Sequence, residues 1–260
     1  MDLGISGRKA IVCASSRGLG RGCAEALAEA GCEVVINGRD TGALNDVAST
    51  LRDRFGTKVT IVEGDVSQPD VQKALIDAGG GEVDILVNNN GGPPRREFEE
   101  LDRDKILSGV VQNMVTPLEL IQAVLPGMTE RGFGRIVNIT SSSVKAPIAG
   151  LDLSSGARAG LTAFLSGVAR TVANRNVTIN NLLPGAMDTA RLMSGHKGVA
   201  EKSGRPLDDV RAEAAKRIPA GRFGTQEEFG QACAFLCSVH AGYITGQNLL
   251  VDGGAFPGAF

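Results

Sequence analysis

The sequence predicts a single α/β domain, spanning residues 1–260, built on a doubly wound parallel sheet of about seven strands with helices on both faces. Short apolar runs rich in β-branched residues alternate with longer segments of helical periodicity. The short runs are apolar nearly throughout, which is typical of strands covered on both faces of a parallel sheet. No linker or low-complexity tract divides the chain, so one domain is the simplest interpretation of its length.

The expected strands are spaced widely enough for a helix to lie between neighbours. In chain order they are Lys9–Ala14, Glu33–Asn37, Val59–Glu63, Asp84–Asn88, Arg135–Thr140, Val177–Leu182 and Asn248–Val251. The first helix places Leu19, Cys23, Leu27 and Ala30 on one face, and Gly31 follows as a stop signal. Strand–helix–strand repetition implies right-handed crossovers between parallel strands.

One segment departs from this alternation. Residues 188–218, between the sixth and seventh strands, are polar and helical in composition but lack a strong apolar stripe. An insertion at this end of a sheet favours a lid over a substrate. The alternative is a pair of solvated surface helices.

Composition excludes several classes of function. The net charge is −2 with no basic stripe, which argues against nucleic-acid binding. No apolar run is long enough to cross a membrane, and the first residues lack the layout of a signal peptide. The five cysteines form no CxxC pair and have no companion metal ligands, so we expect reduced thiols in a cytoplasmic protein without a metal.

The loop after the first strand carries the signature of a phosphate site. Residues 13–20 read Cys-Ala-Ser-Ser-Arg-Gly-Leu-Gly. Gly18 and Gly20 let the backbone approach a pyrophosphate, and the helix that they open directs free N–H groups at this anion. Ala14 stands where a first glycine is usual, and we expect its methyl group to be tolerated with a negative φ. The sequence therefore predicts a Rossmann-type dinucleotide-binding domain.

The residues after the second strand favour NADP(H) over NAD(H). An NAD site places an acid there to bind the ribose 2′-hydroxyl, but the chain reads Asn37-Gly38-Arg39 before Asp40. Two guanidinium groups, on Arg17 and Arg39, suit a 2′-phosphate. The alternative is that both arginines are ordinary solvated side chains.

With these motifs in place, the sequence resembles the short-chain dehydrogenase/reductase superfamily along nearly its whole length. Its layout is similar to that of the 3-oxoacyl-acyl-carrier-protein reductases. The matching motifs are the glycine loop (TGxxxGxG in the family, with Cys13 and Ala14 replacing Thr and Gly), Gly64-Asp65-Val66, Asn88-Asn89-Asn90-Gly91 (NNAG in the family), Pro184-Gly185 with Thr189, Tyr243–Gly246, and Val251–Gly254.

The resemblance implies a set of cofactor contacts and an assembly. Asp65 would accept a hydrogen bond from the adenine amino group. The full set of expected cofactor-binding residues is Ala14, Ser16, Arg17, Gly18, Leu19, Gly20, Arg39, Asp65, Val66, Asn89, Gly91, Arg158, Pro184, Gly185, Met187 and Thr189. The resemblance also implies a homotetramer, with long helices within 101–130 and 153–173 supplying the subunit contacts.

The catalytic pattern departs from that of the family. The family has a serine after the fifth strand and then Tyr-x-x-x-Lys at the start of the next helix. Ser141 matches the serine, whereas Ser154 and Arg158 hold the positions of the tyrosine and lysine. Asn113 falls where the family keeps a proton-relay asparagine. The one tyrosine of the chain, Tyr243, belongs to the C-terminal signature instead.

This substitution weakens proton donation. A serine hydroxyl is less acidic than a phenol and reaches about 4 Å less far from the backbone. An arginine can hold the nicotinamide ribose but stays charged, so it does not pass on a proton. Other candidate donors are Lys145, Asp152, His196, or a water held by Ser141, Ser154 and Asn113.

Our leading hypothesis is an NADP(H)-dependent oxidoreductase. It would reduce a carbonyl group, in a 3-oxoacyl thioester or a small ketone, or oxidise the matching alcohol. Ser141 would bind the reacting oxygen, and the turn Gly91–Pro94 would form a pocket wall. Two alternatives remain: a catalytically silent NADP(H)-binding sensor or scaffold, and a non-redox enzyme that uses the same pocket.

Overall fold

The computed structural model describes residues 1–259 and contains a seven-stranded sheet in which every neighbouring pair is parallel. Its strands are β1 (Lys9–Val12), β2 (Glu33–Gly38), β3 (Val59–Glu63), β4 (Ile85–Asn88), β5 (Gly134–Ile139), β6 (Val177–Pro184) and β7 (Asn248–Val251). The spatial order is β3-β2-β1-β4-β5-β6-β7. The expected doubly wound α/β fold is confirmed, and every expected strand appears with its ends within two residues of the prediction.

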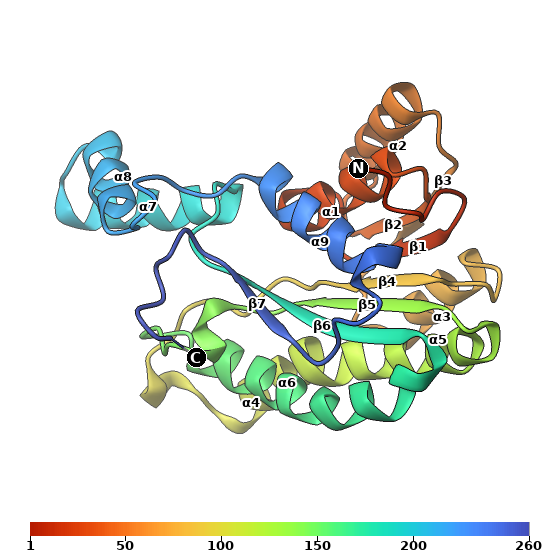
Figure 1. Ribbon diagram of the computed structural model, residues 1–260. Helices are drawn as coiled ribbons and strands as arrows, with labels where there is room; N and C mark the ends of the chain where they lie inside the picture. The colour runs from red at the N-terminus through yellow and green to blue at the C-terminus, as the bar shows by residue number, and fades with distance from the viewer. Residues whose placement is uncertain (260) are drawn as a thin grey trace.

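Helices cover both faces of the sheet (Figure 1). They are α1 (Gly18–Glu29), α2 (Thr41–Phe55), α3 (Pro69–Ala78), α4 (Arg103–Val110), α5 (Thr116–Arg131), α6 (Asp152–Val172), α7 (Ala190–Ser203), α8 (Leu207–Lys216) and α9 (Gln226–Cys237). Along β1, Ala10 and Val12 pack with α1, α2 and α9, while Ile11 between them packs with α3, α5 and α6. Both faces of the strand are therefore buried, which explains why the strands lack a polar alternation.

The segment expected to form a lid consists of α7 and α8. The two helices stand apart from the layers around the sheet in Figure 1. No residue of α7 is buried, and Val210 is the one buried residue of α8. These helices are thus held by few apolar contacts, and their role as a lid stays a prediction.

The cysteines lie in the core as free thiols. Burial raises the pKa of the Cys13 thiol to about 12, against a smaller opposing hydrogen bond from Asn89. Within residues 1–259 there is no cluster of side chains suited to a metal ion. No helix in the same range has the length and apolar character needed to cross a bilayer.

Ala14 does not keep the negative φ at which its methyl group was expected to be tolerated. Ala14 adopts φ +45°, in the left-handed region, and β1 ends at Val12 rather than at Ala14 as expected. Hydrogen bonds fix this conformation, because the Ala14 N–H donates to Asn37 Oδ1 (3.1 Å) and its carbonyl accepts from Asn89 Nδ2 (3.1 Å). A side chain in this region destabilises the backbone by about 1–2 kcal/mol.

We expect Ala14→Gly to stabilise the protein. Removal of the methyl group relieves the left-handed strain, while the greater flexibility of glycine in the unfolded chain offsets part of the gain. The expected net increase in the free energy of unfolding is about 0.5–1 kcal/mol, measured by urea denaturation.

Ala163→Gly is the matched control. Ala163 is exposed in the middle of the right-handed helix α6, where glycine lowers stability by roughly 1 kcal/mol. If Ala14→Gly lowered stability by as much, the argument from backbone strain would be wrong.

Candidate active site

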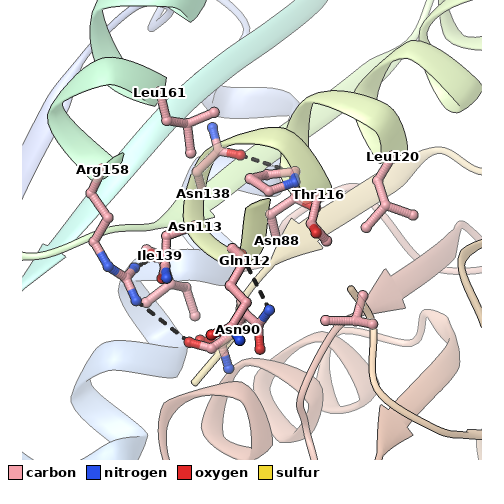
Figure 2. A pocket seen from close by; sticks show the side chains of 13 residues that line it. Asn88, Asn90, Gln112, Asn113, Thr116, Leu120, Asn138, Ile139, Arg158 and Leu161 are labelled. Carbon is pink, nitrogen blue, oxygen red and sulfur yellow. Dashed lines mark hydrogen bonds between the residues drawn. The ribbon is translucent and has the colours of Figure 1, made fainter. Parts of the chain in front are cut away.

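The candidate site lies where the strand order reverses between β1 and β4. In an open parallel sheet, the loops that leave the carboxyl ends of the strands diverge at this point and form a crevice. A small hollow that opens to solvent lies beside it, at the ends of β4 and β5. It is lined by Val66, Asn88, Asn89, Asn90, Gln112, Asn113, Thr116, Pro117, Leu120, Asn138, Ile139, Arg158 and Leu161 (Figure 2).

The loop after β1 has the geometry of a phosphate site. A Cβ on Gly20 would lie 2.3 Å from the Ala14 carbonyl oxygen, so only glycine fits. The buried Ser15 hydroxyl donates to Val12 O (2.8 Å) and accepts from Asn37 N (3.0 Å), which ties the loop to β2. Helix α1 then begins at Gly18 without a side-chain cap from Arg17. Its first N–H groups are therefore available to an anion, as a dinucleotide pyrophosphate requires.

Two arginines and two carboxylates lie in the glycine loop and after the neighbouring strands β2 and β3. Arg17 pairs with Asp40 at 2.9 Å, and Arg39 lies 4.0 Å from Asp65. Both guanidinium groups are largely exposed. Partial burial opposes ionisation of Asp65, but hydrogen bonds from Ser67 and the charge of Arg39 outweigh it and hold the pKa of this carboxyl below its ordinary value. The group stays an acceptor at neutral pH.

The guanidinium of Arg158 is the charged group of the hollow. It extends from α6 and is 8% exposed. Its Nη1 donates to the carbonyl oxygens of Ile139 and Thr140 (3.0 Å to the latter), and its Nη2 donates to Asn90 O at 3.4 Å. Burial, with a smaller contribution from Arg191, lowers the pKa of Arg158 to about 10. Arg158 thus joins α6 to the ends of β5 and β4, as Figure 2 shows for Asn90 and Ile139.

The hydroxyl groups of Ser141 and Ser154 can each donate a hydrogen bond to a ligand. Ser141 Oγ accepts from Ser143 N (3.1 Å) and Ser143 Oγ (2.9 Å). Ser154 Oγ accepts from Arg158 Nε at 3.2 Å and is on a buried residue. Because each oxygen already acts as an acceptor, the proton of each hydroxyl is available for another oxygen atom. The role of Ser143 in orienting Ser141 was not predicted from the sequence.

Asn113 lies in a π-helical turn rather than in a continuous helix. This turn, Val111–Val115, separates α4 from α5. Asn113 Nδ2 donates to Gly109 O (3.3 Å), while its buried Oδ1 has no partner in residues 1–259. Asn88 Oδ1 and Thr116 Oγ1 in the same hollow are also buried without partners. Three such groups facing one hollow indicate a site for water or for a polar ligand.

An asparagine ladder crosses four strands beside this hollow. Asn88 Nδ2 donates to Asn138 Oδ1 (2.9 Å), Asn138 Nδ2 donates to Asn181 Oδ1 (3.0 Å), and Asn181 Nδ2 donates to Asn248 Oδ1 (2.8 Å). The four residues are direct neighbours in the strand register. This ladder was not predicted from the sequence, although each of these four strands contains an asparagine that could have indicated it.

The remaining expected cofactor residues lie at the same edge of the sheet. Pro184 ends β6, and a Cβ on Gly185 would lie 2.6 Å from Asp252 Cβ, which explains the glycine. Met187 is buried, and the Thr189 hydroxyl caps α7 by accepting from Leu192 N (3.3 Å). The cofactor-binding roles of these residues stay predictions.

The alternative proton donors lie outside the lining of the hollow. Lys145 is exposed with its Nζ 5.6 Å from the Phe256 ring centroid. Asp152 is exposed in the first turn of α6. His196, on α7, packs against Phe223 with ring centroids 5.4 Å apart. Ser154 is also outside this lining, but it is bonded to Arg158, which is part of it, and Asn113 lines the hollow directly. Ser154 and a water at Asn113 are therefore the better placed of the donors considered.

Comparison with known proteins assigns the family. A family model described as enoyl-(acyl carrier protein) reductase matches residues 13–255. The 3-oxoacyl-[acyl-carrier-protein] reductase of Vibrio cholerae is 33% identical over 258 residues, covering 98% of this chain and 99% of the relative. The chain belongs to the short-chain dehydrogenase/reductase superfamily. The expected superfamily and the similarity to 3-oxoacyl-acyl-carrier-protein reductases are confirmed.

Solved structures of superfamily members agree over nearly the whole chain. L-sorbose reductase from Gluconobacter frateurii, complexed with NADPH and L-sorbose, matches with a TM-score of 0.94 and 29% identity, covering 99% of this chain and 100% of that structure. An NADPH-dependent reductase involved in bacilysin biosynthesis matches with a TM-score of 0.92 and 29% identity, covering 97% and 100%. The relatives are thus oxidoreductases of this superfamily.

We expect Asn138→Ala to lower the free energy of unfolding by about 2–4 kcal/mol. The change leaves two side-chain atoms, Asn88 Nδ2 and Asn181 Oδ1, buried without their hydrogen-bond partners. Each such loss destabilises the protein by about 1–3 kcal/mol. Urea denaturation measures the change.

Thr178→Val gives the contrasting control on β6. The Thr178 hydroxyl is buried with no partner in residues 1–259, and valine has nearly the same shape. We expect this variant to be as stable as the wild type or more stable by about 1 kcal/mol. Equal losses in the two variants would mean that the ladder hydrogen bonds do not explain the effect.

Proposed function

We propose that the protein is an NADP(H)-dependent oxidoreductase that reduces a carbonyl group, in a 3-oxoacyl thioester or a small ketone, or oxidises the matching alcohol. The main observation in its support is the hollow at the carboxyl edge. There the buried Arg158 guanidinium and the Ser154 hydroxyl stand at the same edge as the glycine loop that opens α1. The related structures include an NADPH-dependent reductase and a sorbose reductase complexed with NADPH, which is consistent with this proposal.

The residues present fit a phosphorylated dinucleotide. Gly18 and Gly20 leave room for the pyrophosphate at the uncapped start of α1. Arg17 and Arg39, both largely exposed, would bind the 2′-phosphate, and Asp65 the adenine amino group. When bound, NADP(H) supplies or accepts the hydride.

The side chains of the hollow would bind the substrate and supply the proton. The free proton of Ser141 would hydrogen-bond the reacting oxygen as negative charge develops on it. Arg158 would hold the nicotinamide ribose through an N–H that the protein leaves unused. The unpartnered Asn113 Oδ1 would hold a water that, with Ser154, delivers the proton.

This active site is atypical for the superfamily. We propose that Ser154 and Arg158 occupy the positions of the catalytic tyrosine and lysine. A positioned general acid contributes roughly 10²–10⁴-fold to the rate, whereas orientation of the two reactants contributes on the order of 7–11 kcal/mol. Activity should therefore be lower than with a tyrosine but should persist.

We further propose that the protein acts in the cytoplasm as a homotetramer, as the resemblance implies. The helices that would supply the subunit contacts carry exposed apolar side chains, which supports this assembly. They are Ile106 and Leu107 on α4, Val111 in the π-helical turn, and Phe164 on α6.

NADPH should bind more tightly than NADH by about tenfold or more, as measured by fluorescence titration. Arg39→Gln should reduce this preference, because it removes a cation from the expected 2′-phosphate site. Arg103→Gln, an exposed arginine on α4, is the matched control and should preserve the preference. Equal affinities in the wild type would contradict the proposal.

The enzyme should consume NADPH when offered a panel of ketones and 3-oxoacyl thioesters, followed by nicotinamide absorbance. Ser141→Ala should lower kcat by about 10²–10³-fold, since it removes a donor to the developing oxyanion. Ser142→Ala should leave kcat nearly unchanged. Ser142 bonds through its backbone carbonyl, which accepts from Lys145 N and Ala146 N, and the substitution keeps this carbonyl.

The other outcomes identify the two alternative functions. Tight NADPH binding without oxidation across the panel would favour a sensor or scaffold. Product formation without NADPH consumption would favour a non-redox enzyme.

A further inference from the structure

Arg158 has no carboxylate partner within residues 1–259. Its four hydrogen bonds go to three backbone carbonyls and the Ser154 hydroxyl. A guanidinium has five N–H groups, so one donor on Nη2 remains unused. Neutral acceptors solvate a buried cation but do not neutralise it. An anion entering the hollow would therefore find a buried, uncompensated positive charge.

A second cation, on the exposed Arg191, lies against the loop whose Asn90 lines the hollow. Arg191, in the first turn of α7, reaches across to the loop after β4 and donates to Gly92 O (3.1 Å) and Pro93 O (3.1 Å). It has no carboxylate partner in the described part of the chain, and it bonds to the same loop that Arg158 contacts through Asn90 O. Both guanidinium groups are therefore bonded to one four-residue stretch, 90–93, which contains no carboxylate.

The loops around the mouth share this excess of positive charge. The segments 89–97, 140–151 and 184–196 carry four cationic side chains, on Arg95, Arg96, Lys145 and Arg191, and two carboxylates, on Glu97 and Asp188. Glu97 caps the 3₁₀ turn that follows, and Asp188 is already paired with Arg211 at 3.0 Å. A cleft lined by one sign of charge attracts ligands of the opposite sign.

We propose that the substrate is an oxo acid, whose carboxylate is bound by the guanidinium group of Arg191 while its ketone oxygen faces Ser141. This inference rests on the proposed function and names its substrate class. Arg191 uses two of its five N–H groups on Gly92 O and Pro93 O, so three remain for the two oxygens of a carboxylate. Arg191 would then also join the expected lid to the substrate.

The reaction balances without a further reagent. The ketone carbon takes the hydride that NADPH loses, the ketone oxygen takes one proton from water, and the products are a hydroxy acid and NADP⁺. The carboxylate is unchanged throughout. Its binding energy serves to orient the ketone.

The test compares oxo acids with their methyl esters. The probes are 2-oxo and 3-oxo acids of four to eight carbons and the corresponding esters, with NADPH consumption followed by absorbance. We expect KM for the preferred acid to be at least about tenfold below that for its ester, a difference of about 1.4 kcal/mol. Arg191→Gln should raise KM for the acid about tenfold and leave both KM for the ester and the Kd of NADPH unchanged.

Arg205→Gln is the matched control. Arg205 lies in the same segment but pairs with Glu213 at 2.8 Å, so this variant should keep the preference for the acid. If Arg191→Gln instead weakened NADPH binding, Arg191 would pair with a cofactor phosphate and the proposal would be overturned. Oxidation of NADPH with esters as readily as with acids would also overturn it, while leaving the reductase function intact.

A binding measurement keeps the inference testable if no compound is reduced. Calorimetry would then titrate the hydroxy acid, or its methyl ester, into the enzyme saturated with NADP⁺. Acid-selective binding that Arg191→Gln abolishes would support the carboxylate site even though the proposed reductase activity had failed. Equal binding of acid and ester would overturn the carboxylate site.

Discussion

The reversal of strand order between β1 and β4 is the constraint on which the rest of the site depends. Because all seven strands are parallel, every loop that leaves a carboxyl end emerges at the same edge of the sheet. The crossovers on either side of the reversal run in opposite directions, so the loops after β1 and β4 separate there. The glycine loop, the Asn89–Asn90 turn and the Arg158 guanidinium meet at this opening although they are distant in the sequence.

Arg158 illustrates how backbone geometry can substitute for an ion pair. The carbonyls of Ile139, Thr140 and Asn90 converge because β4 and β5 end side by side and α6 begins opposite them. Their dipoles stabilise the buried charge without cancelling it. A lysine has a single nitrogen and could not span these acceptors, whereas the planar fork of arginine reaches them together. This geometry fixes the guanidinium and leaves its net charge available to a ligand.

The sequence predicted the strands, because their positions depend on apolar patterning. It did not predict local backbone conformations that depend on hydrogen bonds between distant segments. Strands such as β2 and β6 were identifiable because burial on both faces makes them apolar throughout. The left-handed φ of Ala14 was not, because it follows from bonds to Asn37 and Asn89, which lie far along the chain. The position of Asn113 was expected, but its π-helical turn was not. Nothing in local periodicity distinguishes such a turn from a regular helix.

The asparagine ladder has a direction. Every amide nitrogen donates away from the hollow, from β4 toward β7, so the side-chain dipoles add head to tail. The electronegative end of this series is Asn88 Oδ1, which lies buried at the hollow without a partner. The side of the hollow at Asn88 is therefore slightly negative, while the side at Arg158 is positive. A molecule with an anionic end is favoured in one orientation, with its charged group on the side of Arg158 and its uncharged part toward the asparagines.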